Sequence, residues 1–125
     1  MSGNDGTVWY LRIQEDDLGA AVLLRLEGRV YNATSSDLAR AVDRCCAGDR
    51  RAVLLDFSAV DYINGQGLSL VEAAAVRLRA ESRQLVVFGL CPAVETAFDL
   101  SGALASVTVE PSRDAALRHI DPNRS

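Results

Sequence analysis

The sequence predicts an α/β fold with a mixed central sheet of about four or five strands and about four helices. Short apolar runs, as at residues 53–57 and 85–88, alternate with segments whose apolar residues recur at intervals of three and four. Two strand-like runs open the chain with no helix between them. The alternation favours parallel strands joined by right-handed crossovers, and the opening pair favours one antiparallel strand at the side of the sheet.

The opening strands are the first elements. Residues 8–13 are rich in strand formers, and residues 16–19 supply the chemistry of a turn. Residues 20–27 predict a second strand that Gly28 ends, so the opening is a hairpin or an antiparallel pair.

A loop and a helix come next. Residues 29–34 predict a connection in which Asn32, Thr34 or Ser35 caps the helix that follows. That helix ends near Gly48. Its core-facing residues are Leu38, Ala41, Val42 and Cys45.

The central unit reads as strand, tight loop and helix. The apolar run at 53–57 leads through residues 58–63 into two closely spaced glycines, Gly65 and Gly67. The helix that follows carries an apolar face made of Leu68, Val71, Ala75 and Leu78. In such a unit the loop lies at the carboxyl end of a strand and the amino end of a helix, where unpaired N–H groups point outward.

The last third repeats the alternation. Residues 85–88 predict a buried strand, and Pro92 suits the first turn of a helix over 93–100. Residues 105–109 predict a short strand. Ser112 caps a final helix that carries Ala116, Leu117 and Ile120.

Length and composition indicate one domain over residues 8–120, between a disordered N-terminus at 1–7 and a flexible tail at 121–125. No apolar run approaches the roughly 20 residues of a membrane helix. Residues 1–7 do not form a charged and then apolar leader. We therefore expect a cytoplasmic protein with no membrane insertion. The net charge of −4 and the scattered arginines argue against direct nucleic-acid binding.

Few residues suit catalysis. The single histidine, His119, falls in the last helix, where a solvated histidine is more typical than a catalytic one. We interpret Asp56 as a strand-end residue satisfied by backbone donors and Asp61 as a turn residue, not as a carboxylate pair. The cysteines, expected to be reduced, are Cys45, Cys46 and Cys91. Their spacing is not that of metal ligands, so we expect no metal and no cofactor.

The segment at residues 57–68, Phe-Ser-Ala-Val-Asp-Tyr-Ile-Asn-Gly-Gln-Gly-Leu, resembles the signature of the STAS domain family of sulfate transporters and anti-sigma factor antagonists. It is most similar to the small stand-alone bacterial members. The similarity extends to residues 89–94 and 100–102 and covers about residues 8–120. The resemblance implies the STAS fold and a non-enzymatic, protein-binding role in transcription regulation. It also implies a partner that is an anti-sigma factor of the serine kinase-like ATPase type.

The chain departs from the family pattern within that loop. The pattern reads roughly apolar-Asp-Ser-Ser-Gly-Leu, and in the antagonists a partner kinase phosphorylates the first serine. Asn64 stands at the aspartate, Gly65 at the phosphorylated serine and Gln66 at the second serine, whereas Gly67 and Leu68 match. Because glycine has no hydroxyl, the resemblance implies a degenerate loop with no phosphorylation at the usual position.

We expect the partner to dock on the loop at residues 64–67 and on the helix after it. Tyr31 stands where the family usually carries an acidic residue, and it offers an aromatic anchor. The residues expected to bind the partner are Tyr31, Asn32, Asn64, Gly65, Gln66, Gly67, Ser69, Ala73 and Val76. The sequence leaves open whether Ser58 or Ser69 is phosphorylated, and whether the chain is a monomer or a homodimer.

Two other hypotheses follow from the same residues. STAS domains also serve as accessory subunits of lipid ABC transporters and as scaffolds in stress-sensing complexes. From a different class, a small nucleotide-binding protein or enzyme would use the glycine loop as a ligand site, although the loop lacks the third glycine and the later acidic partner of a dinucleotide fingerprint.

Overall fold

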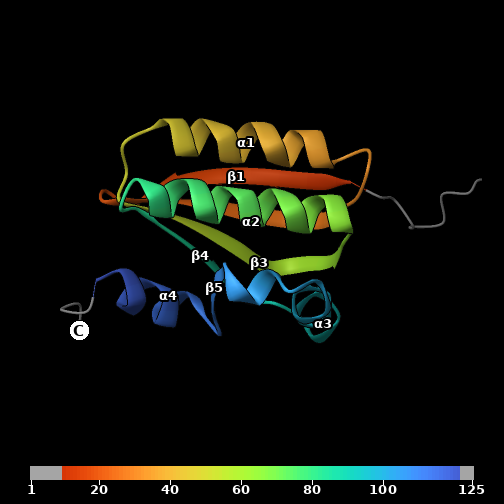
Figure 1. Cartoon of the computed structure of the whole chain (residues 1–125). Coiled ribbons are helices and arrows are strands. Elements are labelled where there is room, and N and C mark those ends of the chain that lie inside the picture. The colour runs from red at the N-terminus through yellow and green to blue at the C-terminus, as the bar shows by residue number, and fades with distance from the viewer. Residues whose placement is uncertain (1–9, 122–125) are drawn as a thin grey trace, which may run out of the picture.

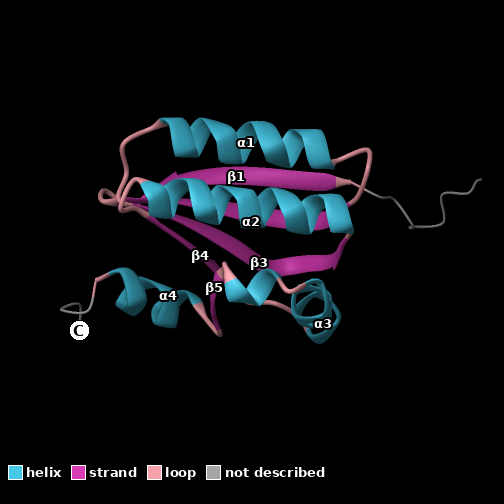
Figure 2. Cartoon of the chain, viewed as in Figure 1, coloured by secondary structure: helices cyan, strands magenta, loops and turns pink. Residues whose placement is uncertain are grey.

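A computed structural model describes residues 10–121, which form a five-stranded sheet with helices on both faces (Figures 1 and 2). In chain order the elements are β1 Leu11–Asp17, β2 Ala21–Val30, α1 Ser35–Ala47, β3 Ala52–Ile63, α2 Gly65–Ala80, β4 Gln84–Phe88, α3 Pro92–Ser101, a 3-10 turn Ala103–Ala105, β5 Thr108–Glu110 and α4 Arg113–Ile120. The strand order is β1-β2-β3-β4-β5, with β1 antiparallel to β2 and the other neighbours parallel. The predicted α/β fold with an antiparallel opening strand is confirmed.

The core has two parts because both faces of the sheet are covered. Leu24 and Leu55 belong to the larger cluster, under α1 and α2, whereas the adjacent Leu23 and Leu54 belong to the smaller one, with Ala116 of α4. Successive strand residues point to opposite faces, so a strand buried on both sides is apolar throughout. Figure 1 shows α1 and α2 side by side over one face and α4 on the other.

The strands β2 and β3 are longer than predicted. A register irregularity next to Gly28 lets them pair as far as Val30 and Ile63. Gly28 has φ +125°, and a Cβ there would lie 2.1 Å from the carbonyl oxygen of Tyr10. This glycine therefore permits the close approach of β1 and does not end β2. The prediction that Asp61 is a turn residue is also wrong, because Asp61 lies within β3.

The turn between β1 and β2 is tighter than predicted. Asp16 and Asp17 belong to β1, and the Oδ1 atom of Asp17 accepts a hydrogen bond from the N–H of Gly19 at 2.8 Å. Gly19 has φ +85°, a conformation that glycine adopts at no steric cost. Residues 8 and 9 of the predicted strand lie outside the described residues. So do the N-terminal segment 1–7 and residues 122–125 of the tail.

The last third follows the prediction with shifted bounds. Pro92 is in the first turn of α3, as expected. The strand expected at residues 105–109 begins only at Thr108, because Ala103–Ala105 form a 3-10 turn. Ser112 caps α4 as predicted, and its Oγ accepts a hydrogen bond from the N–H of Ala115 at 3.1 Å.

Candidate functional site

Two loops meet at one edge of the sheet, at the amino ends of α1 and α2. The strands that lead into them, β2 and β3, are parallel and paired up to Val30 and Ile63. The N–H of Asn64 donates to the carbonyl oxygen of Val30 at 2.9 Å. The parallel register therefore brings the β2–α1 loop, residues 31–34, beside the start of α2.

The side chain of Asn64 joins these loops. Its Oδ1 atom accepts a hydrogen bond from the N–H of Gly67 at 2.9 Å, which caps α2. Its Nδ2 atom donates to Oδ1 of Asn32 at 3.0 Å. One amide thus fixes the helix start and ties it to the neighbouring loop. An ionised aspartate, the residue of the family pattern, accepts hydrogen bonds but has no proton to donate.

The β2–α1 loop is held by its own hydrogen bonds. The N–H groups of Thr34 and Ser35 donate to the carbonyl oxygen of Tyr31 at 3.0 and 2.8 Å. The hydroxyl of Thr34 accepts from the N–H of Tyr31 at 3.0 Å and donates to the carbonyl oxygen of Arg29 at 2.8 Å. Thr34 occupies the cap position of α1, as one of the predicted candidates, but its hydroxyl serves the loop instead of the helix.

The two glycines of the α2 start have different roles. A Cβ at Gly67 would lie 2.6 Å from Cγ1 of Val30 and 2.9 Å from Cγ1 of Ile63. Glycine at that position lets the helix pack on the strand ends. A Cβ at Gly65 would meet nothing within 4 Å, and Gly65 is not among the positive-φ residues. Packing therefore favours glycine at position 67, whereas neither packing nor backbone conformation requires it at position 65.

The residues predicted to bind a partner gather around this edge. Asn32, Gly65, Gln66, Ser69, Ala73 and Val76 are exposed, Tyr31 and Asn64 are partly exposed, and Gly67 is buried. Val76 is an apolar side chain that is 51% exposed. All of these residues are uncharged. These uncharged residues form a surface that runs from the two loops along α2. The buried Gly67 lies against Val30 and Ile63.

The polar groups considered as catalytic candidates do not converge. Oδ1 of Asp56 accepts from the N–H and the hydroxyl of Ser58, at 2.9 and 2.6 Å. The carboxylate of Asp61 binds Arg29, with Nε and Oδ1 3.1 Å apart. Nδ1 of His119 lies 3.1 Å from a carboxylate oxygen of Glu110. Within residues 10–121 no group of three or more His, Cys, Asp or Glu side chains is placed to hold a metal ion.

The cysteines of α1 are buried in the core, as expected for Cys45. Burial raises the pKa of the Cys45 thiol to about 11, with a smaller contribution from the carboxylate of Glu15. Burial also raises the pKa of Cys46. Both side chains are therefore protonated thiols near neutral pH, which is the unreactive form.

Comparison with known families assigns the chain. The STAS domain model matches residues 11–116, which include all five strands and the first half of α4. This chain belongs to the STAS domain family. No helix in the described part of this STAS domain is long and apolar enough to cross a membrane.

Several similar proteins are named as anti-sigma factor antagonists. The domain is 34% identical over 110 residues to BtrV of Bordetella bronchiseptica, provisionally named an anti-sigma factor antagonist, covering 85% of this chain and 91% of BtrV. An anti-sigma factor antagonist from Mycobacterium paratuberculosis has a similar structure, with TM-score 0.83 and 22% identity over 89% of this chain and 94% of the other. The antagonist SpoIIAA in its unphosphorylated form gives TM-score 0.77 and 16% identity over 91% and 100%. The predicted family is confirmed, and the domain is like those of anti-sigma factor antagonists.

Two features of this region could not be predicted from the sequence: the Asn32–Asn64 hydrogen bond and the groove between α1 and α2. Asn32 and Asn64 were both predicted to bind the partner, but nothing in their spacing indicates that they bond to each other. The groove between α1 and α2, with Ala39 and Leu70 on its facing sides, was also missed. Small residues on two helices are usual in any α/β core, and only the packing shows the hollow.

Proposed function

We propose that this STAS domain is a non-enzymatic regulator that binds an anti-sigma factor of the serine kinase-like ATPase type, in the cytoplasm, through the loop at residues 64–67 and the helix α2. The observation that carries the proposal is the Asn32–Asn64 hydrogen bond, which unites two loops into one exposed surface. A fixed surface loses little conformational entropy when a partner binds.

The neutrality of the surface supports the same function. The cores of protein interfaces are depleted of charged residues. In a chain whose residues are 24% charged, the first three turns of α2, residues 65–76, contain a single charged residue, Glu72. Val76 is exposed on α2, and Tyr31 is partly exposed in the β2–α1 loop. These are features of a docking surface.

We further propose that the binding escapes phosphate control at the usual position. Gly65 offers no hydroxyl, although the space above it would admit a serine side chain. The domain would therefore bind its partner constitutively. The partner would leave by dissociation or by competition with another protein, and not because this loop is phosphorylated.

Affinity capture from a lysate of the source organism, followed by mass spectrometry, tests the proposal. The wild-type domain should recover an ATPase of the anti-sigma factor type, and Gly65→Glu should not. This variant should fold, because a side chain at position 65 meets nothing and a carboxylate at a helix amino end is favourable. Gly48→Glu is the matched control. Gly48 follows the carboxyl end of α1, whereas the proposed surface lies at the amino ends of α1 and α2. Recovery of the same ATPase by Gly65→Glu would refute the proposed surface.

A further inference from the structure

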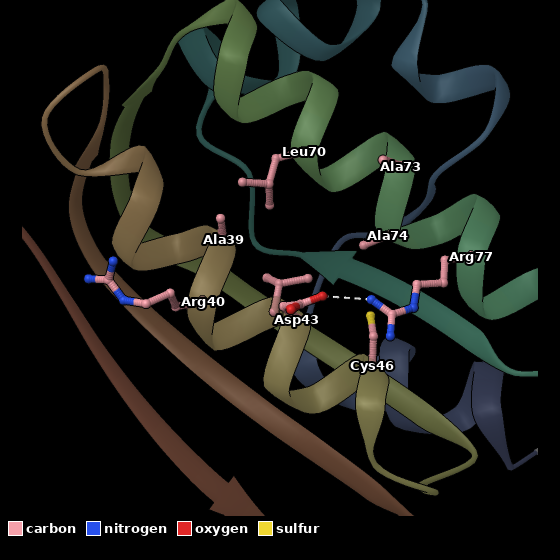
Figure 3. Close-up of a pocket in the computed structure, with 9 residues that line it drawn as sticks. Ala39, Arg40, Asp43, Cys46, Leu70, Ala73, Ala74 and Arg77 are labelled. Carbon is pink, nitrogen blue, oxygen red and sulfur yellow. Dashed lines mark hydrogen bonds and ion pairs between the residues drawn. The ribbon is translucent and has the colours of Figure 1, made fainter.

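A groove separates the exposed sides of α1 and α2. Its volume is about 330 Å³, and its lining residues are Ala39, Arg40, Val42, Asp43, Cys46, Leu70, Ala73, Ala74 and Arg77. Figure 3 shows Leu70 pointing from α2 toward α1, and Ala39 pointing from α1 toward α2. The groove exists because three of the facing residues are alanines, which leave a hollow that larger side chains would fill.

The groove is continuous with the docking surface of the two loops. Residues four apart on a helix lie one above the other, so Leu70 follows Gln66 along α2. Ala73 belongs both to the exposed side of α2 and to the groove lining. A partner that covers the loop at residues 64–67 therefore reaches the groove within one helical turn.

The charges of the groove lie at its ends and edge. The carboxylate of Asp43 and the guanidinium of Arg77 form an ion pair of 2.6 Å that bridges the two helices (Figure 3). Arg40 points away from α2 in the same view and pairs with Asp37 of its own helix. Between the loops and the Asp43–Arg77 bridge the facing residues are apolar, which favours an apolar occupant.

We propose that this groove is the second half of the docking surface and takes one face of an amphipathic helix of the same partner, with its apolar side chains over Ala39, Leu70 and Ala73. This inference rests on the proposed function. The stretch from Leu70 to Arg77 is about 10 Å long, which two turns of a docked helix would cover. Apolar helices seated in grooves are a common mode of protein recognition.

The dimensions fit this occupant. A volume of about 330 Å³ lies at the small end of the range for ligand pockets, and the groove is open along its length. It therefore suits a few side chains presented by a neighbouring helix. The Asp43–Arg77 bridge stays partly exposed, with side chains 73% and 44% accessible, so it can meet polar groups at the end of the docked helix.

The test compares two alanine-to-glutamate variants of α1. Ala39 is half-buried in the groove, and Ala47 is exposed at the carboxyl end of the same helix. Calorimetric titration uses the recombinant ATPase recovered in the capture experiment. Ala39→Glu should weaken its binding about tenfold or more, because docking would bury an unpaired carboxylate, and Ala47→Glu should leave it within about twofold. Circular dichroism and thermal unfolding check that both variants fold.

The outcomes separate the groove from the loop surface. If Ala39→Glu binds like the wild type while Gly65→Glu does not bind, the groove proposal is overturned and the proposed function stands. If Gly65→Glu also binds normally, or the wild type recovers no ATPase, both fail. Sedimentation measures the oligomeric state of the free wild type and of Ala39→Glu. If the wild type is a dimer and Ala39→Glu is a monomer, the groove binds a second copy of the domain, and the proposal is overturned.

Discussion

The opposite roles of Gly65 and Gly67 give the most quantitative prediction. In Gly67→Ala the new methyl group would lie 2.6 and 2.9 Å from buried carbons of Val30 and Ile63. Overpacking of this kind costs about 1–3 kcal/mol. The lower chain entropy of alanine in the unfolded state offsets about 0.4–1 kcal/mol of this cost. We expect Gly67→Ala to lower the free energy of unfolding by about 1–2 kcal/mol.

Gly65→Ala should behave in the opposite way. Its methyl group meets no atom within 4 Å, and the residue has no positive φ, so only the gain of about 0.4–1 kcal/mol from the unfolded state remains. The two variants should differ by about 2 kcal/mol, which corresponds to roughly 6–10 °C in Tm for a domain of this size. Urea and thermal unfolding measure both quantities. A destabilised Gly65→Ala, or a Gly67→Ala as stable as the wild type, would refute the assignment of Gly65 to the surface and Gly67 to packing.

Three further predictions concern the same loops and the β1–β2 turn. Asn64→Ala removes both the cap of α2 and the bond to Asn32, so it should lower the free energy of unfolding by about 1–2 kcal/mol in urea titrations. Asn32→Ala loses only the bridge and should cost less, about 0.5–1.5 kcal/mol; equal costs would contradict the double role of Asn64. Gly65→Ser should accept phosphate from the partner ATPase and radiolabelled ATP and then lose binding, whereas labelling of the wild type at this loop would be inconsistent with its glycine. Hydrogen bonds from Arg50, and then from the N–H of Gly19, lower the pKa of Asp17 from 3.8 to about 2. The pairing therefore stabilises the fold above about pH 4 and is lost as the pH falls toward 2, so the stability difference between wild type and Asp17→Asn should shrink over that interval and stay constant above it.

Much of the fold could be predicted from periodicity and turn residues. The buried runs around Leu54 and Val86 have no alternation, which identified strands covered on both faces. The ends of β2 and β3 could not be predicted in the same way. Gly28 reads as a strand breaker, but its φ of +125° serves a close approach of β1 that depends on pairing between distant residues. The sequence around Asp61 likewise indicates a turn. Only the pairing of β2 with β3 shows that Asp61 lies in a strand and pairs with Arg29.

The candidate site was predictable in outline because a loop after a parallel strand must lie at the sheet edge. The resemblance of residues 57–68 to the family signature pointed to the same place. The sequence could not show which glycine the packing requires, since that depends on the distance of position 67 from Val30 and Ile63. Nor could it show the Asn32–Asn64 bond, which joins residues 32 positions apart.

Binding of the partner at the start of α2 should protect the amides there, and amide hydrogen exchange with and without the ATPase measures this protection. The first N–H groups of a helix have no intrahelical acceptor, so those of Gly65 and Gln66 should exchange rapidly in the free domain. In the complex, exchange at residues 64–70 should slow, and exchange in α4 should stay unchanged. Slowed exchange confined to β1 or α4, with residues 64–70 unaffected, would contradict it.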